Sequence, residues 1–241
     1  MIKVEKTEVW GFEHAIRGMR NPKNSWGKSD SGVKCIAKQE FNEPASIYGF
    51  VVGKNDLNLM RQLYKGGSEH RKYLRQIFVS MDITAPLYWW KEFDTYKVGT
   101  TADSCSTMHK IHAKEFELDD FSHEHLSDAC LGISEGYAFI PEFVFKDLID
   151  TLNQARNKYL ETKDKKYWWQ MIQLLPSSYN QKRTVTFTYE NVVSMIRQRS
   201  GHKLDEWRNF VEILKDLPYV REIIDEADNI RRVEEDSKAE S

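Results

Sequence analysis

The sequence has little cysteine, no long hydrophobic run and no apolar leader. Its 241 residues include only three cysteines, an odd number that argues against a secreted disulfide scaffold and favours a reducing compartment. No apolar run approaches the ~20 residues that span a bilayer, and the first residues lack the apolar core of a signal peptide. We therefore expect a cytoplasmic protein without a membrane partner.

The sequence also lacks a large excess of positive or negative charge. Lys and Arg total 35, Asp and Glu total 37, and the net charge of −2 gives no general attraction to nucleic acid. We expect no nucleic-acid partner, and any anionic ligand must be bound by local cations. With 40% hydrophobic residues, the chain can still bury a substantial core.

Common nucleotide and hydrolase signatures are missing as well. The sequence has no Gly-x-Gly-x-x-Gly turn, no Gly-x4-Gly-Lys-Ser/Thr loop and no Gly-x-Ser-x-Gly elbow. A nucleotide site in this chain must therefore be of a less common type.

The N-terminal half alternates loops, helices and one clear strand. Gly18 to Gly32, rich in Asn, Ser and Gly, predicts a mobile loop. Asp56 to Tyr64 has apolar residues at helical spacing and is closed by two glycines. Alternating apolar residues then predict a strand from Ile77 to Thr84. Pro86 is suited to begin a helix that runs to about Tyr96.

The C-terminal half is mostly helical. An apolar stripe predicts a long helix from Pro141, and Thr184 to Thr188 is a short β-branched run. Further helices are predicted over Lys165 to Leu175, Tyr189 to Arg199 and Lys203 to Leu217. This uneven order predicts an α+β domain over residues 1–220, followed by a charged, disordered tail over 221–241.

The segment Lys97 to Thr107 carries five hydroxyls and a thiol and is flanked by Lys97 and Lys110. Hydroxyls, backbone N–H groups and lysines bind phosphate, and Asp103 can accept hydrogen bonds from a sugar or base. The alternative is a solvent-facing loop whose Ser and Thr residues cap helices and form turns.

A second candidate is Arg199, which ends one predicted helix just before another begins. A cation beside a helix N-terminus makes an anion site. The alternative is an arginine that only interacts favourably with the C-terminal end of its own helix.

Five potential metal ligands lie close together in the sequence, namely Cys105, His109, His112, His123 and His125. Their spacing matches no common zinc pattern, and histidines in a polar segment are usually solvated. We expect no metal, and a metal-dependent enzyme remains the least favoured reading.

The order of these features resembles the flavin-dependent thymidylate synthases. The strand ending at Ala85-Pro86, the aromatic helix and the polar segment are similar to the centre of that family, whose signature reads R-H-R-x-x-S-x-N-E-x-S-x-R-Y. Downstream, Leu175-Pro176 and the helix ending in Arg199 resemble its C-terminal half. The resemblance covers roughly Asp56 to Leu214. It implies a central antiparallel or mixed sheet packed with helices, and a helical C-terminal part.

Along the signature, some groups are kept and others are changed. Lys97, Thr100 and Asp103 are chemically similar to the arginine, serine and glutamate of the family. The other two arginines become Thr95 and Thr107, whose hydroxyls hold a phosphate very differently from a guanidinium fork.

The resemblance implies methyl transfer to a pyrimidine deoxynucleotide of the deoxyuridylate type. FAD would be the cofactor, methylenetetrahydrofolate the carbon donor and NADPH the reductant, in a homotetramer that binds its ligands where subunits meet. Arg199 would polarise the pyrimidine carbonyl. Cys105, which replaces a serine, is either a nucleophile or a small residue filling a small space.

The same resemblance assigns the remaining residues. On the substrate side it places Glu92, Lys97, Thr100, Asp103, Ser104, Ser106 and Thr107, and on the flavin side His70, Arg75, Thr188 and Ser194. Because the signature is so altered, the alternative is a catalytically silent homologue that keeps the fold as a nucleotide-binding or oligomeric interaction protein.

Overall fold

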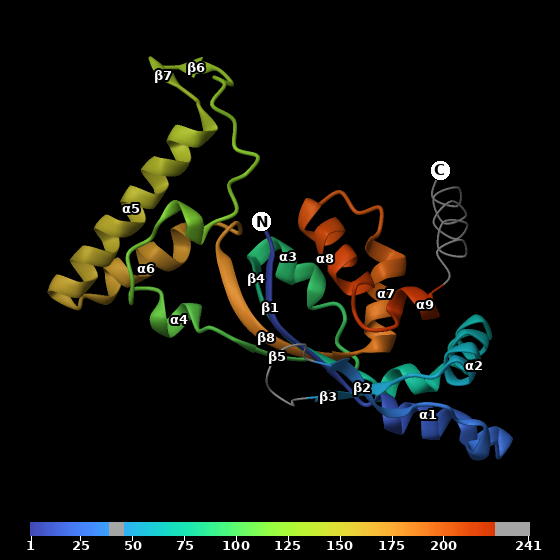
Figure 1. Ribbon diagram of the computed structural model, residues 1–241. Coiled ribbons are helices and arrows are strands. Elements are labelled where there is room, and N and C mark those ends of the chain that lie inside the picture. The colour runs from blue at the N-terminus through green and yellow to red at the C-terminus, as the bar shows by residue number, and fades with distance from the viewer. Residues whose placement is uncertain (39–45, 225–241) are drawn as a thin grey trace. The chain divides into compact units, whose positions relative to one another are not determined.

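The computed structural model describes residues 1–38 and 46–224, and these form two compact units (Figure 1). Unit 1 consists of Met1–Glu5, Asp82–Tyr96 and Ala102–Thr184. Unit 2 consists of Lys6–Met81, Lys97–Thr101 and the described part of Val185–Ser241. Within these ranges, no helix is both long and apolar enough to cross a membrane.

Four strands form the main sheet, in the order β1-β4-β8-β5. Their bounds are Lys3–Trp10 for β1, Phe78–Pro86 for β4, Asn180–Thr188 for β8 and Thr101–Ser104 for β5. Strands β4 and β8 run antiparallel, because Thr184 donates to Asp82 Oδ1 (2.7 Å) while Thr186 donates to Ser80 Oγ (3.2 Å). A central antiparallel sheet with helices confirms the predicted α+β class.

The alternation read from the sequence holds along β4. Val79, Met81, Ile83 and Ala85 are buried, whereas Phe78 is 36% exposed. Since side chains of a strand point to opposite faces in turn, one face of β4 supplies a continuous apolar surface to the core. The predicted strand is confirmed and extends to Pro86.

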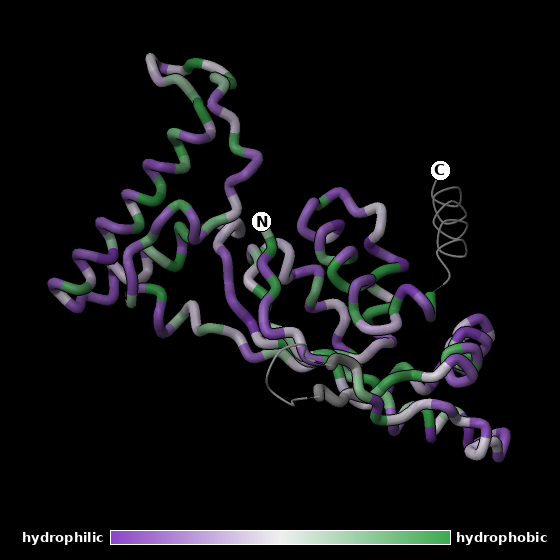
Figure 2. Tube along the Cα trace, viewed as in Figure 1, coloured by the Kyte–Doolittle hydropathy of each residue, from purple (hydrophilic) through white to green (hydrophobic). Residues whose placement is uncertain are grey.

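Unit 1 is built from one short aromatic helix and one helical hairpin. Helix α3 (Leu87–Phe93) follows Pro86 and buries Trp89, Trp90 and Phe93. The long helix α5 (Pro141–Thr162) packs on α6 (Lys165–Leu174), and hydrophilic and hydrophobic residues alternate along α5 (Figure 2). The remaining elements are α4 (Thr107–Lys110), η4 (Leu118–Asp120), β6 (Ile133–Ser134) and β7 (Tyr137–Ala138). The helices predicted from Pro141 and from Lys165 are confirmed.

Unit 2 combines a small hairpin with a helical core. Its elements are α1 (Phe12–Arg20), η1 (Asn21–Lys23), η2 (Trp26–Lys28), β2 (Gly32–Lys38), β3 (Ser46–Val51), α2 (Lys54–Lys65), η3 (Lys72–Gln76), α7 (Tyr189–Arg199), α8 (Asp205–Lys215) and α9 (Val220–Ile223). Helix α7 packs on α8, and both bury one apolar face. The predicted helix over Tyr189–Arg199 has the bounds observed for α7.

The prediction of a mobile loop over Gly18 to Gly32 is wrong. The segment comprises the end of α1 and the two short helices η1 and η2. It is ordered because Asp56, on α2, accepts hydrogen bonds from both ends of the segment. Composition alone does not reveal such a long-range partner.

The charged tail was predicted to begin at residue 221, but residues 221–224 belong to the core of unit 2. Helix α9 contacts α2, and Ile223 and Ile224 are buried. Burial of Ile223 and Ile224 and the hydrogen bond from Arg61 to the Glu222 carbonyl connect this stretch to the rest of unit 2. The rest of the predicted tail, from residue 225, lies outside the described residues.

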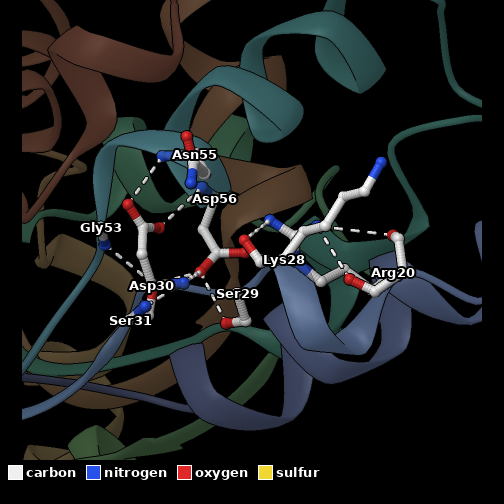
Figure 3. Close-up of polar contacts among 9 residues, drawn as sticks. Arg20, Lys28, Ser29, Asp30, Ser31, Gly53, Asn55 and Asp56 are labelled. Carbon is white, nitrogen blue, oxygen red and sulfur yellow. Dashed lines mark hydrogen bonds and ion pairs between the residues drawn. The ribbon is translucent and has the colours of Figure 1, made fainter.

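The carboxylate of Asp56 is the centre of this ordering (Figure 3). Its side chain has no exposed surface, and Arg20, 4% exposed, donates from Nε to Oδ1 at 2.6 Å. Oδ2 accepts from Ser29 Oγ (2.7 Å) and Ser31 Oγ (2.6 Å) and from the backbone N–H groups of Asp30 and Ser31 (both 3.1 Å). A buried carboxylate is tolerated only when paired and hydrogen-bonded in this way.

The connection is reciprocal, since Asp30 in turn binds the start of α2. Its carboxylate oxygens accept the backbone N–H groups of Asn55 (3.0 Å) and Asp56 (3.2 Å). These are N–H groups of the first helical turn, which have no partner within the helix. Gly53 makes this approach possible, because a Cβ there would collide with the Asp30 carboxylate.

We expect Asp56→Asn to lower the free energy of unfolding by about 3–5 kcal/mol, because the buried guanidinium of Arg20 loses its counter-charge. Urea denaturation measures this. The control is Asp150→Asn at an exposed position of α5, which should change stability by less than about 0.5 kcal/mol. Equal effects of the two substitutions would contradict the role given to Asp56.

The same carboxylate predicts a pH dependence. Burial, the largest influence, raises the pKa of Asp56, but the hydrogen bonds from Ser31, Ser29, Arg20 and Asp30 together lower it below its usual value of 3.8. A lowered folded-state pKa means that the stabilisation is complete well above pH 3.8 and is lost as the pH falls through the folded-state value. The stability difference between wild type and Asp56→Asn should therefore be constant at neutral pH and shrink below pH 3.8. A difference that grows on acidification would refute this.

Candidate functional site

The residues predicted for the site are divided between the two units. Unit 1 holds Glu92, Asp103, Ser104, Cys105, Ser106 and Thr107. Unit 2 holds His70, Arg75, Lys97, Thr100, Thr188, Ser194 and Arg199.

In the hydroxyl-rich segment, strand β5 is followed by the short helix α4, where a loop was predicted. Strand β5 is the last strand of the main sheet, and the Cys105 N–H donates to the Lys182 carbonyl (2.9 Å), which continues the pairing with β8. As an edge strand it leaves one side without a neighbouring strand, and Asp103, Ser104 and Cys105 are all exposed. The segment therefore presents polar side chains on a fixed backbone.

Two of the hydroxyls have local structural partners. Ser106 caps α4 by accepting the His109 N–H (3.1 Å). Thr107 Oγ1 accepts from Gln181 Nε2 (3.1 Å), which also donates to the Cys105 carbonyl (3.0 Å). For Ser106 and Thr107, the capping and turn-forming alternative is thus the one the structure supports. Asp103, Ser104 and Cys105 are exposed on the surface of unit 1.

Gln181 belongs to a chain of polar contacts along β8. Its side-chain carbonyl accepts from Arg183 Nε (2.9 Å), and its backbone carbonyl accepts from Trp90 Nε1 (2.9 Å). The guanidinium of Arg183 lies 4.2 Å from the centre of the Trp90 ring and donates to Asp94 Oδ1 (2.8 Å). Arg183 is thereby held in place by a carboxylate and an aromatic face.

Sequence reasoning did not identify Gln181 or Asp94. Gln181 and Arg183 are two residues apart on one strand, so their side chains lie on the same face. The sequence shows this spacing but not the residues that the two side chains contact. Near Asp94, the Thr95 hydroxyl donates to the backbone carbonyl of Glu92 (2.7 Å), while the Glu92 side chain is half-buried.

In unit 2, the start of the signature segment is bound to the N-terminus of α7. Asn191 Nδ2 donates to the Val98 carbonyl (2.9 Å), and Asn191 Oδ1 accepts from the Thr188 hydroxyl (2.7 Å). Gly99 has a φ of +76°, a backbone conformation that favours glycine. Thr188 is buried and caps α7, so its hydroxyl has a structural role.

Thr100 and Lys97 differ in their surroundings. The Thr100 Oγ1 is buried, and among the described residues it has no hydrogen-bond partner. Buried hydroxyls are normally paired, so an orphaned one requires an explanation such as a bound molecule. Lys97, three residues before Thr100, is exposed.

Arg199 is half-buried at the end of α7, with its guanidinium 4.9 Å from the centre of the Trp207 ring. The first turn of the next helix, α8, carries Asp205 and Glu206. Their charges complement the positive helix end and repel an anion. Of the predicted anion site, the cation of Arg199 remains.

His70 lies on the wall of a cavity of about 380 Å³ in unit 2. The cavity also contains Lys23, Lys72 and Tyr73, whose hydroxyl donates to the Met60 carbonyl (2.9 Å). Sequence reasoning missed both lysines, because one lies in the presumed loop and the other in a short 3-10 helix. Arg75 is exposed and does not line this cavity, and Ser194 is half-buried on α7.

In residues 1–38 and 46–224, no three His, Cys, Asp or Glu side chains come together as a metal site.

The element order and sheet define the class of fold, that of the flavin-dependent thymidylate synthases. One similar structure is thymidylate synthase X (ThyX) from Helicobacter pylori with FAD and dUMP, at 17% identity and a TM-score of 0.61, covering 92% of this chain and 96% of that chain. Another is flavin-dependent thymidylate synthase ThyX from the same bacterium, complexed with FAD and dUMP, at 17% identity, a TM-score of 0.60 and coverages of 91% and 96%. At this identity the likeness establishes the fold, as the resemblance in sequence predicted.

No protein-family profile matches the sequence, and no curated protein does.

Because Gln181 donates to the Cys105 carbonyl and the Thr107 hydroxyl, we expect Gln181→Ala to raise amide hydrogen exchange over residues 101–107 at least threefold, with exchange of α5 unchanged. Mass spectrometry of the peptides measures this. Gln170→Ala on α6 is the control and should leave the segment unaffected. Unchanged exchange in Gln181→Ala would show that backbone pairing with β8 is sufficient.

Proposed function

We propose that this chain is a flavin-dependent enzyme that transfers a methyl group to a pyrimidine deoxynucleotide, of the dUMP to dTMP type. The observation that carries the proposal is the fold likeness to FAD- and dUMP-bound ThyX over 92% of the chain. The exposed, backbone-fixed segment at the signature position supports it. Methylenetetrahydrofolate and NADPH are the proposed co-substrates, and a homotetramer is the proposed assembly.

The nucleotide would be bound without the family's paired arginines. At their positions, the Thr95 hydroxyl already binds a backbone carbonyl and the Thr107 hydroxyl already binds Gln181. Arg183 is held by Asp94 and Trp90. In unit 2, Lys97 and the Thr100 hydroxyl are the groups proposed to bind the phosphate. In unit 1, Ser104 and Asp103 are the groups proposed to hydrogen-bond the nucleotide, with Asp103 as an acceptor for sugar or base. One lysine binds phosphate as a point charge, so we expect weaker binding than with a guanidinium fork.

The residues present are compatible with a flavin on the side of His70. The cavity there has the size of a ligand pocket and is lined by His70, Lys23, Lys72 and Glu69. Its two lysines match the phosphates of FAD in charge, whereas Glu69 does not. Arg75 and Ser194 lie outside that cavity, and Thr188 caps a helix. When bound, the flavin would supply the reducing equivalents for the new methyl group.

Arg199 has the chemistry to polarise the pyrimidine carbonyl. A guanidinium is always charged and donates to an oxygen that gains negative charge in the transition state. Its contact with the Trp207 ring restrains its position. Cys105, exposed at the end of β5, is the proposed nucleophile, because a thiolate adds readily to an electron-poor ring.

Growth of a thymidine-requiring bacterium carrying this chain tests the proposal. We expect rescue by wild type and its loss in Arg199→Ala, with Arg197→Ala, an exposed neighbour on the same helix, as the control that retains rescue.

Cys105→Ala should lower turnover at least a hundredfold if the thiol is covalent, and unchanged turnover would remove it from the mechanism. The purified protein should be yellow and stabilised against heat by dUMP.

A second candidate is a nucleotide-binding protein without turnover, favoured by the local bonding of Thr95 and Thr107. Good expression without rescue, combined with thermal stabilisation by dUMP, would establish this reading in place of the first.

A further inference from the structure

A second cavity in unit 2, of about 460 Å³, lies between the segment that contains η1 and η2 and one face of α2. Among the described residues that line it, only Leu59 is apolar. The polar side chains include Lys23, Ser25 and Lys28 from the segment, and Asn55, Asn58 and Gln62 from α2. The volume is within the range of small-molecule sites, which are usually lined by apolar groups. An occupant of this cavity must therefore be bound by charge and by hydrogen bonds.

Positive charge prevails in this cavity. Lys23 and Lys28 are exposed, and within residues 1–38 and 46–224 neither forms an ion pair. No Asp or Glu of those residues lines the cavity. Arg20 also lines it, but the carboxylate of Asp56 at 2.6 Å balances its charge. The two ammonium groups are therefore not neutralised and favour an anionic ligand.

The backbone that carries Lys28 is fixed by the buried ion pair. Arg20 donates from Nη2 to the Lys28 carbonyl and from Nη1 to the Ser25 carbonyl (both 3.1 Å). Ser25 Oγ accepts from Arg20 Nη1 (3.4 Å), so the hydroxyl hydrogen of Ser25 can be donated to a ligand. Because this backbone is already ordered, only side chains lose conformational freedom when a ligand binds.

Three carboxamides form the opposite wall. Asn55, Asn58 and Gln62 follow one another at intervals of three and four residues, which places them on one face of α2. All three are exposed, and within the described part of the chain their side-chain amides form no hydrogen bond. Each amide can both donate and accept, as a hydroxyl group of a ligand requires. No aromatic side chain of the described residues lines the cavity, so a nucleobase or a flavin ring would have no stacking surface there.

We propose that this cavity binds a phosphate monoester of a small polyhydroxylated molecule, such as a sugar phosphate. The phosphate carries about 1.5–2 negative charges at pH 7 and would lie between Lys23 and Lys28. The hydroxyl groups would exchange hydrogen bonds with the carboxamides of Asn55, Asn58 and Gln62. An unphosphorylated sugar lacks the charge, and inorganic phosphate does not reach the carboxamides. The site is separate from the signature segment and does not depend on the proposed methyl transfer.

Calorimetric titration of the full chain tests the inference. The probes are glucose 6-phosphate, ribose 5-phosphate and glycerol 3-phosphate, with glucose and inorganic phosphate as comparison compounds. We expect at least one of the three esters to bind at least tenfold more tightly than glucose and inorganic phosphate. Binding of none of the esters, or an affinity for them equal to that of either comparison compound, would overturn the inference.

Variants locate the site. Lys28→Ala and Asn58→Asp should each raise the dissociation constant of the best ester at least tenfold, because the first removes a positive charge and the second adds a negative one at nearly constant size. Lys54→Ala, at an exposed lysine of α2 that does not line the cavity, is the control and should leave the constant unchanged. Both altered side chains are exposed, so folding should be little affected.

Thermal stabilisation by dUMP separates this site from the proposed nucleotide site, and it should be the same in both variants as in wild type. Unchanged affinity for the ester in both variants would overturn the inference. A loss of dUMP stabilisation in both variants would do so as well, because it would assign the ester to the nucleotide site.

Discussion

Burial of the Asp56 carboxylate is the constraint on which unit 2 depends. A charge without exposed surface must be matched by donors, and all of those donors come from residues 20–31, far from Asp56 in the sequence. Such an arrangement adds little net stability compared with an apolar core, but breaking it is costly. Its hydrogen bonds connect residues 20–31 to α2. Lys23, in the cavity of His70, and Lys28, in the cavity beside α2, belong to this segment. A single buried pair thereby shapes the surroundings of both cavities.

In unit 1 a buried aromatic side chain positions polar groups at the surface, whereas in unit 2 a buried charge orders the segment around it. Trp90 is buried, and its indole N–H and ring face hold Gln181 and Arg183 on β8. Gln181 then holds the turn at Cys105. The fold persists at 17% identity to ThyX because the burial pattern tolerates many sequences. Function depends on particular groups and does not follow from the fold. The signature that the sequence resembles has two arginines where this chain has Thr95 and Thr107.

Periodicity in the sequence predicted the elements that bury one face. The strand β4, the long helix α5 and the bounds of α7 follow from apolar spacing and from the prolines and capping residues at their ends. Segments whose order depends on distant partners were predicted wrongly. Residues 18–32 resemble a loop in composition, and residues 221–224 resemble a charged tail, yet Asp56 and α2 hold them. The hydroxyl-rich segment was recognised as a candidate site, but its strand conformation comes from pairing with β8.

The sequence by itself determined the α+β class, the near-neutral charge and the candidate residues Lys97, Asp103, Cys105 and Arg199, because composition and spacing are local properties. Only the tertiary structure decided which of the candidates are exposed at the surface. It assigned the Ser106, Thr107 and Thr188 hydroxyls to capping and turn contacts, and it left the Thr100 hydroxyl buried without a partner among the described residues. The physical reason is that a hydroxyl can serve the backbone or a ligand, and only the neighbours brought close by folding determine which.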